Sequence, residues 1–334
     1  MRRGLMLLRW PAAFALVAAI ALHDGIADAW RLVERAGPLL LWLVPLHALP
    51  LLLDARAWHL LLQRRIALTV LWLIAAVREA VSRLLPVFGI GGELAGIRLA
   101  SRFMQDPYRV SRVSASVVVE VLVTIAVQYA FAMLGLALLY AGSTNAQVGR
   151  AVGVALAVSL PLPFVLFALL RRGGLFHGLA RIATRLLPAR DASSSGIDGR
   201  QLDADIRVLL GKPRLLAAAF AWQFAGYLLG SAEIYLALAL LGHPASIGAA
   251  IAIEAITQAV RQAVFIAPAG LGVQEATVVA VARAFGIGGE AALSLALVRR
   301  MREIAWGCIA TAAWRVVEAR GLREPVAIRR RTLR

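Results

Sequence analysis

The chain has 334 residues, 60% of them hydrophobic, and a mean hydropathy of +0.76. Soluble domains contain about 45–50% apolar residues, so this composition excludes an ordinary soluble protein. The formal net charge of +17 would suggest nucleic-acid binding in a soluble protein. Because the arginines stand in loops and tails between apolar runs, membrane orientation explains them, and we predict no nucleic-acid partner.

The apolar runs are continuous and do not alternate with polar residues, which favours helices over a barrel. We predict full membrane spans at residues 7–22, 38–53, 116–141, 150–170, 214–241 and 291–313. Two further apolar regions, 66–97 and 247–285, are interrupted by Pro and Gly, and each is long enough for two short helices. The predicted fold is therefore an all-α polytopic membrane protein with about six full spans and two broken or re-entrant helical hairpins.

The first apolar run follows Arg2 and Arg3, and Ala19-Ile20-Ala21 resembles a cleavage site, so a signal peptide is an alternative to an uncleaved first helix. We predict a single transmembrane domain over 1–319, with halves at 1–141 and 150–319, and a basic cytoplasmic tail at 320–334. Cys308 is the only cysteine and the five histidines are scattered, so no disulfide, metal site or cofactor is expected.

Loop charges give a topology. The segment 171–214 carries nine Lys and Arg against four Asp, and 98–112 carries four Arg, whereas 142–149 and 242–247 carry no charged residue. The positive-inside rule then places both termini in the cytoplasm, provided that the two interrupted regions are re-entrant hairpins opening from opposite faces. Arms of about 15 residues reach about 22 Å, short of the ~30 Å hydrocarbon core, although arms that both cross remain an alternative.

The two interrupted regions resemble each other at an offset of about 182 residues. The first contains Arg78-Glu79-Ala80-Val81, Pro86, Gly89, Gly91, Gly92 and Glu93, and the second contains Arg261-Gln262-Ala263-Val264, Pro268, Gly270, Gly272 and Glu275. Broken helices in corresponding positions of an inverted repeat indicate a transport site near the bilayer midplane. The hinge or helix-break residues are Pro86, Gly91, Gly92, Pro268, Gly270 and Gly272. The alternative is that Pro and Gly merely kink two packed helices.

Charged residues also fall inside the last predicted span. Arg299, Arg300, Arg302 and Glu303 follow Ala291 by eight to twelve residues, a depth of about 12–18 Å. Each such group costs about 2.5–3.5 kcal/mol in lipid, so these side chains must face protein or water. The i,i+4 spacing predicts that Arg299 pairs with Glu303 and that Glu79 pairs with Arg83.

Polar stripes on other helices offer partners for the remaining charges. They comprise Glu254, Gln258, Arg261 and Gln262; Glu120, Thr124 and Gln128; and Gln223, Gly226, Gly230 and Glu233. We predict a polar, net-basic cavity that takes a lipid headgroup or another anionic group. The alternative is an internal salt-bridge network that only fixes the register of the helices.

Three stretches carry a resemblance to a known family. Pro268-Ala269-Gly270-Leu271-Gly272-Val273-Gln274-Glu275, Ala284-Phe285-Gly286 and Arg299-Arg300-Met301-Arg302-Glu303 resemble the flippase-like transmembrane family of lysylphosphatidylglycerol synthases. Leu85-Pro86, Gly91-Gly92-Glu93 and Arg98 fit a second signature of that family. The run at 298–303 is similar to hopanoid biosynthesis-associated membrane proteins. The resemblance covers nearly the whole chain.

The resemblance implies a protein of the bacterial inner membrane that translocates or handles lipids, namely hopanoids or anionic or aminoacylated lipids. The full synthases add a soluble aminoacyl-transferring domain, which we do not expect here. The predicted substrate-binding residues are Glu93, Arg98, Glu254, Gln258, Arg261, Glu275, Arg299, Arg300, Arg302 and Glu303. Two alternatives remain, an intramembrane lipid transferase and a scaffold for lipid-biosynthesis enzymes, although the sequence shows no catalytic constellation. The expected partners are membrane lipids and, in the scaffold alternative, such enzymes.

Overall fold

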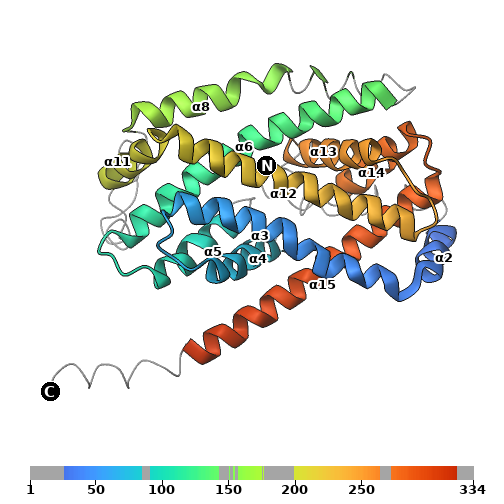
Figure 1. The fold of residues 1–334 in the computed structure, drawn as a ribbon, viewed down its shortest axis with the longest axis horizontal. Helices are drawn as coiled ribbons and strands as arrows, with labels where there is room; N and C mark the ends of the chain where they lie inside the picture. The colour runs from blue at the N-terminus through green and yellow to red at the C-terminus, as the bar shows by residue number, and fades with distance from the viewer. Residues whose placement is uncertain are drawn as a thin grey trace, which may run out of the picture.

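The computed structural model describes residues 26–84, 91–142, 150, 153–154, 157–174, 176, 199–263 and 272–321, and its regular secondary structure in these residues is entirely helical (Figure 1). The first half contains α2 (Ile26–Ala36), the 3-10 segment η1 (Gly37–Trp42), α3 (Leu43–Leu61), α4 (Leu68–Leu84), α5 (Gly91–Ala100), η2 (Ser101–Phe103) and α6 (Arg109–Gly142). The second half contains α8 (Pro161–Arg172), α11 (Gly199–Leu210), α12 (Pro213–Leu240), α13 (Ile247–Ala263), α14 (Val273–Ala284) and α15 (Gly289–Gly321). The prediction of an all-α membrane protein is confirmed.

Three helical stretches among the described residues are long and apolar enough to cross a membrane, namely Trp30–Leu61, Arg109–Gly142 and Pro213–Leu240. They contain the spans predicted at 38–53 and 116–141, and the third covers the span predicted at 214–241 to within one residue. Helix α15 is 33 residues long and contains the span predicted at 291–313, but the charges in its middle keep it out of this group. Helix α8 falls at the end of the span predicted at 150–170, and the span at 7–22 lies outside the described residues.

Local sequence explains several helix boundaries. Pro161 and Pro213 open α8 and α12, where the missing proline N–H removes no helical hydrogen bond. Helix α8 ends at Gly173, whose positive φ of 72° suits a residue without a side chain. In each interrupted region one helix ends and another begins, since α4 gives way to α5 and α13 gives way to α14. Pro86, Pro268 and Gly270 lie in the breaks, outside the described residues.

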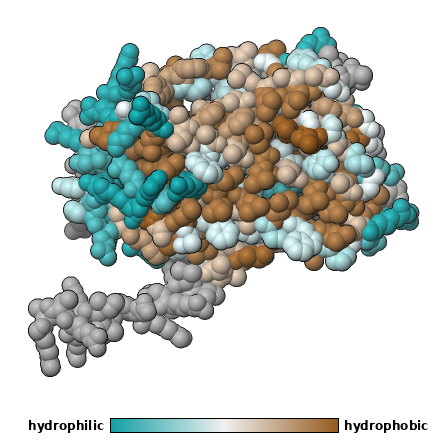
Figure 2. Space-filling model, in the orientation of Figure 1, coloured by the Kyte–Doolittle hydropathy of each residue, from teal (hydrophilic) through white to brown (hydrophobic). Residues whose placement is uncertain are grey.

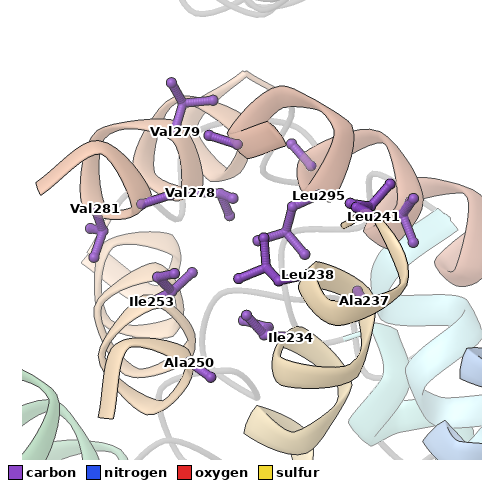
Figure 3. Packing of buried hydrophobic residues seen from close by; sticks show 14 of the residues in the cluster. Ile234, Ala237, Leu238, Leu241, Ala250, Ile253, Val278, Val279, Val281 and Leu295 are labelled. Carbon is purple, nitrogen blue, oxygen red and sulfur yellow. The ribbon is translucent and has the colours of Figure 1, made fainter. Parts of the chain in front are cut away.

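The helices pack as a bundle with two short pairs inside it. Helix α3 packs along α12, α4 packs against α5 and α15, and α13 packs against α14 and α6. Figure 3 shows one apolar core, in which Ile234 and Leu238 of α12 meet Ile253 of α13, Val278 of α14 and Leu295 of α15. These side chains are almost completely buried. The core fixes α14 and α15 against α12 and α13.

The surface separates polar ends from an apolar middle. Figure 2 shows hydrophilic side chains gathered at the two ends of one face, with hydrophobic side chains across the band between them. Large apolar side chains such as Leu41, Val158 and Phe164 are exposed on the molecule. An apolar band of this kind is expected of a surface that faces lipid, and it indicates that the membrane normal joins the two polar ends.

Two glycines of α5 allow this helix to approach α4. A Cβ atom on Gly92 would lie 2.2 Å from Ser82 Oγ and 2.5 Å from the Arg78 carbonyl oxygen. A Cβ atom on Gly96 would lie 2.6 Å from the Arg78 Cδ atom. The predicted hinge residue Gly92 is therefore a close-packing residue, which is one use that membrane helices make of glycine.

Gly92→Ala is expected to lower the free energy of unfolding by about 1–3 kcal/mol, because the added methyl overlaps backbone and forces α5 away from α4. Thermal unfolding in detergent micelles measures the change. Gly230→Ala is the matched control, because a Cβ atom there meets nothing within 4 Å and alanine favours a helix. An unchanged melting temperature for Gly92→Ala would contradict the packing.

Candidate functional site

A cluster of charged side chains lies inside the bundle around the middle of α15. This helix supplies Arg299, Arg302 and Glu303, which are buried, and Arg300, whose side chain is 21% exposed. Their partners come from α3, α12, α13 and α14, so that both halves of the chain meet here. The four residues were predicted to turn away from lipid, and the structure places them against protein.

Arg299 pairs with the adjacent helix α13. Its Nη1 atom donates to Glu254 Oε2 at 2.5 Å, and Gln258 Nε2 donates to the second carboxylate oxygen at 2.7 Å. The prediction that Arg299 pairs with Glu303 is therefore wrong. An i,i+4 pair is the best choice on an isolated helix, whereas here a carboxylate on a packed neighbour is nearer.

Arg300 joins α15 to the start of α14. Its Nη2 and Nε atoms donate to Glu275 Oε1 at 2.6 and 3.1 Å, and its Nη1 atom donates to Glu303 Oε2 at 2.9 Å. The other oxygen of Glu275 accepts the N–H of Gly272 at 2.8 Å, and Gly272 has a φ of +78°. Gln274 donates to Glu303 Oε1 at 3.2 Å. The helix break predicted at Gly272 is thus tied to the charges of α15.

Arg302 reaches across the bundle to α12 and α3. It pairs with Glu233, and its Nη1 atom lies 2.7 Å from His47 Nδ1. The same imidazole lies between two carboxylates, with Nδ1 2.8 Å from Glu233 Oε1 and Nε2 2.8 Å from Glu79 Oε2. Glu79 was predicted to pair with Arg83, whose side chain lies outside the described residues. His47 therefore connects α3, α4, α12 and α15.

A second group of buried charges is built around Arg78 of α4, the residue that precedes Glu79. Arg78 Nη1 donates to both carboxylate oxygens of Glu120 on α6, at 3.0 and 2.9 Å. Its guanidinium carbon lies 4.7 Å from the centre of the Trp58 ring. Gln223 of α12 donates to Asp54 Oδ1 at 3.1 Å and also contacts Thr124 of α6. These contacts hold α3, α4, α6 and α12 together.

The cluster around α15 combines acids and bases among the described residues. Its charged members are Glu79, Glu233, Glu254, Glu275, Glu303, Arg299, Arg300 and Arg302, together with His47. Each of these arginines pairs with at least one of the carboxylates. That the cavity is net basic stays a prediction.

Some polar atoms of the described cluster are buried without a hydrogen-bond partner. They include Arg299 Nε, Arg302 Nε and Trp306 Nε1, and in the first half Glu93 Oε2 has the same property. Buried polar atoms in proteins are nearly always satisfied, and lipid cannot satisfy them. These atoms are therefore positions where water or a polar group of a ligand would be stabilised.

The predicted substrate-binding residues divide into two sets. The structure brings together Glu254, Gln258, Glu275, Arg299, Arg300, Arg302 and Glu303. Arg98 is exposed in the last turn of α5, whereas Glu93 and Arg261 are half-buried on α5 and α13. Sequence reasoning omitted His47, Arg78 and Asp54 from the site. The sequence could have indicated them, because an ionisable residue within an apolar run is a candidate site residue.

A pocket of about 230 Å³ opens at one polar end of the bundle, separate from the cluster. Its charged lining residues are Arg65, Arg112, Asp205 and Lys212. They stand just after α3, near the start of α6, on α11 and just before α12. The two loops predicted to be cytoplasmic, 98–112 and 171–214, therefore meet at the same end.

An all-helical bundle with an apolar surface and a buried charge cluster is typical of an integral membrane protein. The sequence model of the lysylphosphatidylglycerol synthase TM region matches residues 9–325, and the chain belongs to this family. Membership indicates a membrane-located, lipid-related function. No curated protein and no solved structure matches the chain.

Proposed function

We propose that the chain moves a polar lipid between the leaflets of the bacterial inner membrane, with the cluster around α15 as the headgroup site. The observation that carries the proposal is the set of buried charges and unpartnered polar atoms in the middle of α15. Helix packing alone does not require these charged groups. The free-energy cost of placing them in the membrane is offset if they contact a polar headgroup. The lipid-related family supports the same conclusion.

The carboxylates of the cluster favour a headgroup that carries an amine over one that is only anionic. Glu79 and Glu233 both contact His47 inside the bundle, and a carboxylate binds an ammonium group through charge-assisted hydrogen bonds. An aminoacylated phospholipid has such a group. Hopanoids are a second candidate class, favoured by the run 298–303 and its similarity to hopanoid-associated proteins.

We infer that the two short helix pairs are re-entrant and open from opposite faces. Arg65, just before α4, and Arg112, after α5, line one pocket at the basic end. At the other end, a Cβ atom on Gly142 would lie 2.8 Å from the Phe285 ring, so α14 ends beside the end of α6. With the basic end in the cytoplasm, both termini are cytoplasmic.

An inverted repeat accounts for this arrangement. The order α3, α4, α5, α6 recurs as α12, α13, α14, α15, with 17 residues in α4 and in α13 and with 34 and 33 residues in α6 and α15. The contacts are reciprocal as a two-fold axis requires, because α4 packs on α15 and α13 packs on α6. A site at the repeat interface suits alternating access.

Reconstitution tests the proposal. Purified protein in lipid vesicles should move tail-labelled aminoacylated phosphatidylglycerol into the leaflet that dithionite reaches, faster than protein-free vesicles do. Labelled phosphatidylglycerol without the amine should move more slowly, because it has no ammonium group for the carboxylates of the cluster to bind. Equal rates with and without protein, for both lipids, would contradict translocation, and faster movement of the plain lipid would contradict the amine preference.

The two other functions give different outcomes in the same vesicles. A transferase would convert the labelled lipid to a new chemical species, which chromatography detects. A scaffold would move no lipid but would retain lipid-biosynthesis enzymes on the vesicles. We propose transport over both because the described cluster pairs its carboxylates with arginines, and a carboxylate held in an ion pair is a poor general base.

A further inference from the structure

The pocket of about 230 Å³ at the basic end of the bundle is separate from the cluster around α15. It opens between the end of α3, the first turns of α6, helix α11 and the residue that precedes α12. Figure 1 shows α11 at the left end of the molecule, and Figure 2 shows hydrophilic side chains gathered at this end. The pocket therefore lies where the apolar band gives way to the polar surface, which is the level of the lipid phosphates.

Three cationic side chains from separate parts of the chain line this pocket. They are Arg65, which follows α3, Arg112 on α6 and Lys212, which precedes α12. Arg65 Nη1 donates to Asp106 Oδ2 at 3.1 Å, and Arg112 Nη1 lies 2.5 Å from the same oxygen. One carboxylate thus holds two guanidinium groups side by side, and each guanidinium has further N–H donors beyond the Nη1 contact.

Positive charge exceeds negative charge among the described residues of the pocket. Asp205 is the carboxylate in its lining, and it accepts hydrogen bonds from Ser111 Oγ at 3.2 Å and from Gln201 Nε2 at 3.0 Å. Lys212 is exposed and forms no ion pair within the described part of the chain. With Asp106 and Asp205 both counted, three cations face two carboxylates, so one positive charge is left for a ligand to neutralise.

The turn that leads from α3 into the pocket has an unusual backbone. Gln63 and Arg64 have φ values of 52° and 60°, in the left-handed region that side chains disfavour. A helix commonly ends with one left-handed residue, usually glycine, whereas here two larger residues adopt this conformation in succession. Gln63 lines the pocket, and Arg65 follows directly. Such backbone conformations are concentrated at ligand-binding sites, which favours a binding role for this turn.

The apolar part of the lining favours a lipid over a soluble phosphate ester. Leu61, Met104 and Leu209 are buried in the walls of the pocket, and Val208 is 57% exposed beside them. A soluble anion gains nothing from these side chains, whereas the first acyl carbons of a phospholipid bury apolar surface there. A phosphodiester carries one negative charge, which matches the surplus positive charge, and guanidinium groups bind phosphate oxygens through charge-assisted hydrogen bonds.

We propose that this pocket binds the phosphodiester of an anionic phospholipid from the adjacent leaflet. Arg65, Arg112 and Lys212 contact the phosphate oxygens, and Asp205 accepts a hydrogen bond from a headgroup hydroxyl, which phosphatidylglycerol supplies. Basic pockets between transmembrane helices on the cytoplasmic side bind anionic headgroups in other membrane proteins. The site goes beyond the proposed function, because a lipid can bind here whether or not the protein moves lipids between leaflets.

The test follows the melting temperature of the full chain in a neutral detergent as lipid is added. A ligand that binds the folded state raises this temperature, so phosphatidylglycerol should raise it more than phosphatidylcholine, which has no net charge. Lys212→Gln should weaken the apparent affinity for phosphatidylglycerol about fivefold, and Lys212→Arg should keep it. Because Lys212 is exposed, Lys212→Gln without lipid should melt at the wild-type temperature, which separates loss of binding from loss of fold.

Arg214→Gln is the matched control, because it removes the same charge from an exposed position two residues away that does not line the pocket. It should bind phosphatidylglycerol as the wild type does. Equal affinities of the wild type and Lys212→Gln, or equal weakening in Lys212→Gln and Arg214→Gln, would overturn the site. An unchanged melting temperature of the wild type with phosphatidylglycerol would also overturn it.

Glycerophosphoglycerol, the same headgroup without acyl chains, distinguishes a lipid from a soluble ligand. It should raise the melting temperature less than phosphatidylglycerol at the same concentration, because it buries no acyl carbons in the pocket. An equal rise would overturn the assignment to a lipid. These binding results do not depend on the vesicle assay, so failure of the lipid site and failure of the proposed function are distinguishable.

Discussion

Arg299→Leu is expected to lower the free energy of unfolding by about 3–5 kcal/mol, one of the two largest effects that the structure predicts. The change leaves Glu254 charged, buried and without its guanidinium, whose Nη1 atom is 2.5 Å away in the native protein. Gln258 remains as a hydrogen-bond donor to Glu254 but supplies no charge. Unfolding in mixed micelles with a denaturing detergent measures the loss.

The double variant Arg299→Leu/Glu254→Leu distinguishes the cost of an unpaired buried charge from the cost of altered side-chain packing. Replacing both members of a buried ion pair by apolar residues is often neutral or stabilising, so the double variant should recover most of the stability. Glu254→Leu alone should be as harmful as Arg299→Leu alone. If the double variant loses the sum of the two single effects, then the pair does not act as one unit.

Arg78→Leu should have an effect of similar size. The change leaves Glu120 buried without a guanidinium, and it removes the contact with the Trp58 ring at 4.7 Å. Gly96 packs directly on the lost side chain, so a gap opens between α4 and α5 as well. We expect a loss of about 3–5 kcal/mol in the same detergent unfolding experiment.

Arg112→Gln is the control for that experiment. Its guanidinium lies 2.5 Å from Asp106, the same distance as in the buried Arg299–Glu254 pair. The Arg112 side chain, however, is 34% exposed at the polar end. A solvent-exposed pair is worth about 0–1 kcal/mol. Similar losses for Arg78→Leu and Arg112→Gln would show that burial is not what makes Arg78 important.

The apolar spans could be predicted from composition because lipid imposes one length on them. Helices α6 and α12 follow unbroken apolar runs, and their positions agree with the predicted spans at 116–141 and 214–241. The interrupted regions could also be predicted, because Pro and Gly cluster in them, whereas a single proline such as Pro50 lies inside α3 without ending it. The use of Gly92 for close packing could not be predicted, because it depends on Arg78 of a different helix.

The charge cluster could be predicted as a set but not as pairs. The mid-span position of Arg299 and Arg302 required protein partners, and Glu254 and Glu275 were among the candidates. Which acid meets which base depends on how the helices are rotated, and a helical repeat does not specify that. His47 was missed because its partners Glu233 and Arg302 are 186 and 255 residues away.

Glu275→Gln in the vesicle assay tests most directly whether the cluster is the lipid site. The amide keeps an oxygen for the N–H of Gly272 but removes the charge that Arg300 contacts at 2.6 Å. Arg315→Gln, exposed on the same helix α15, is the matched control. The account predicts at least about a tenfold slower movement of the aminoacylated lipid for Glu275→Gln, with normal movement for the control. Movement at the wild-type rate by correctly folded Glu275→Gln would contradict it.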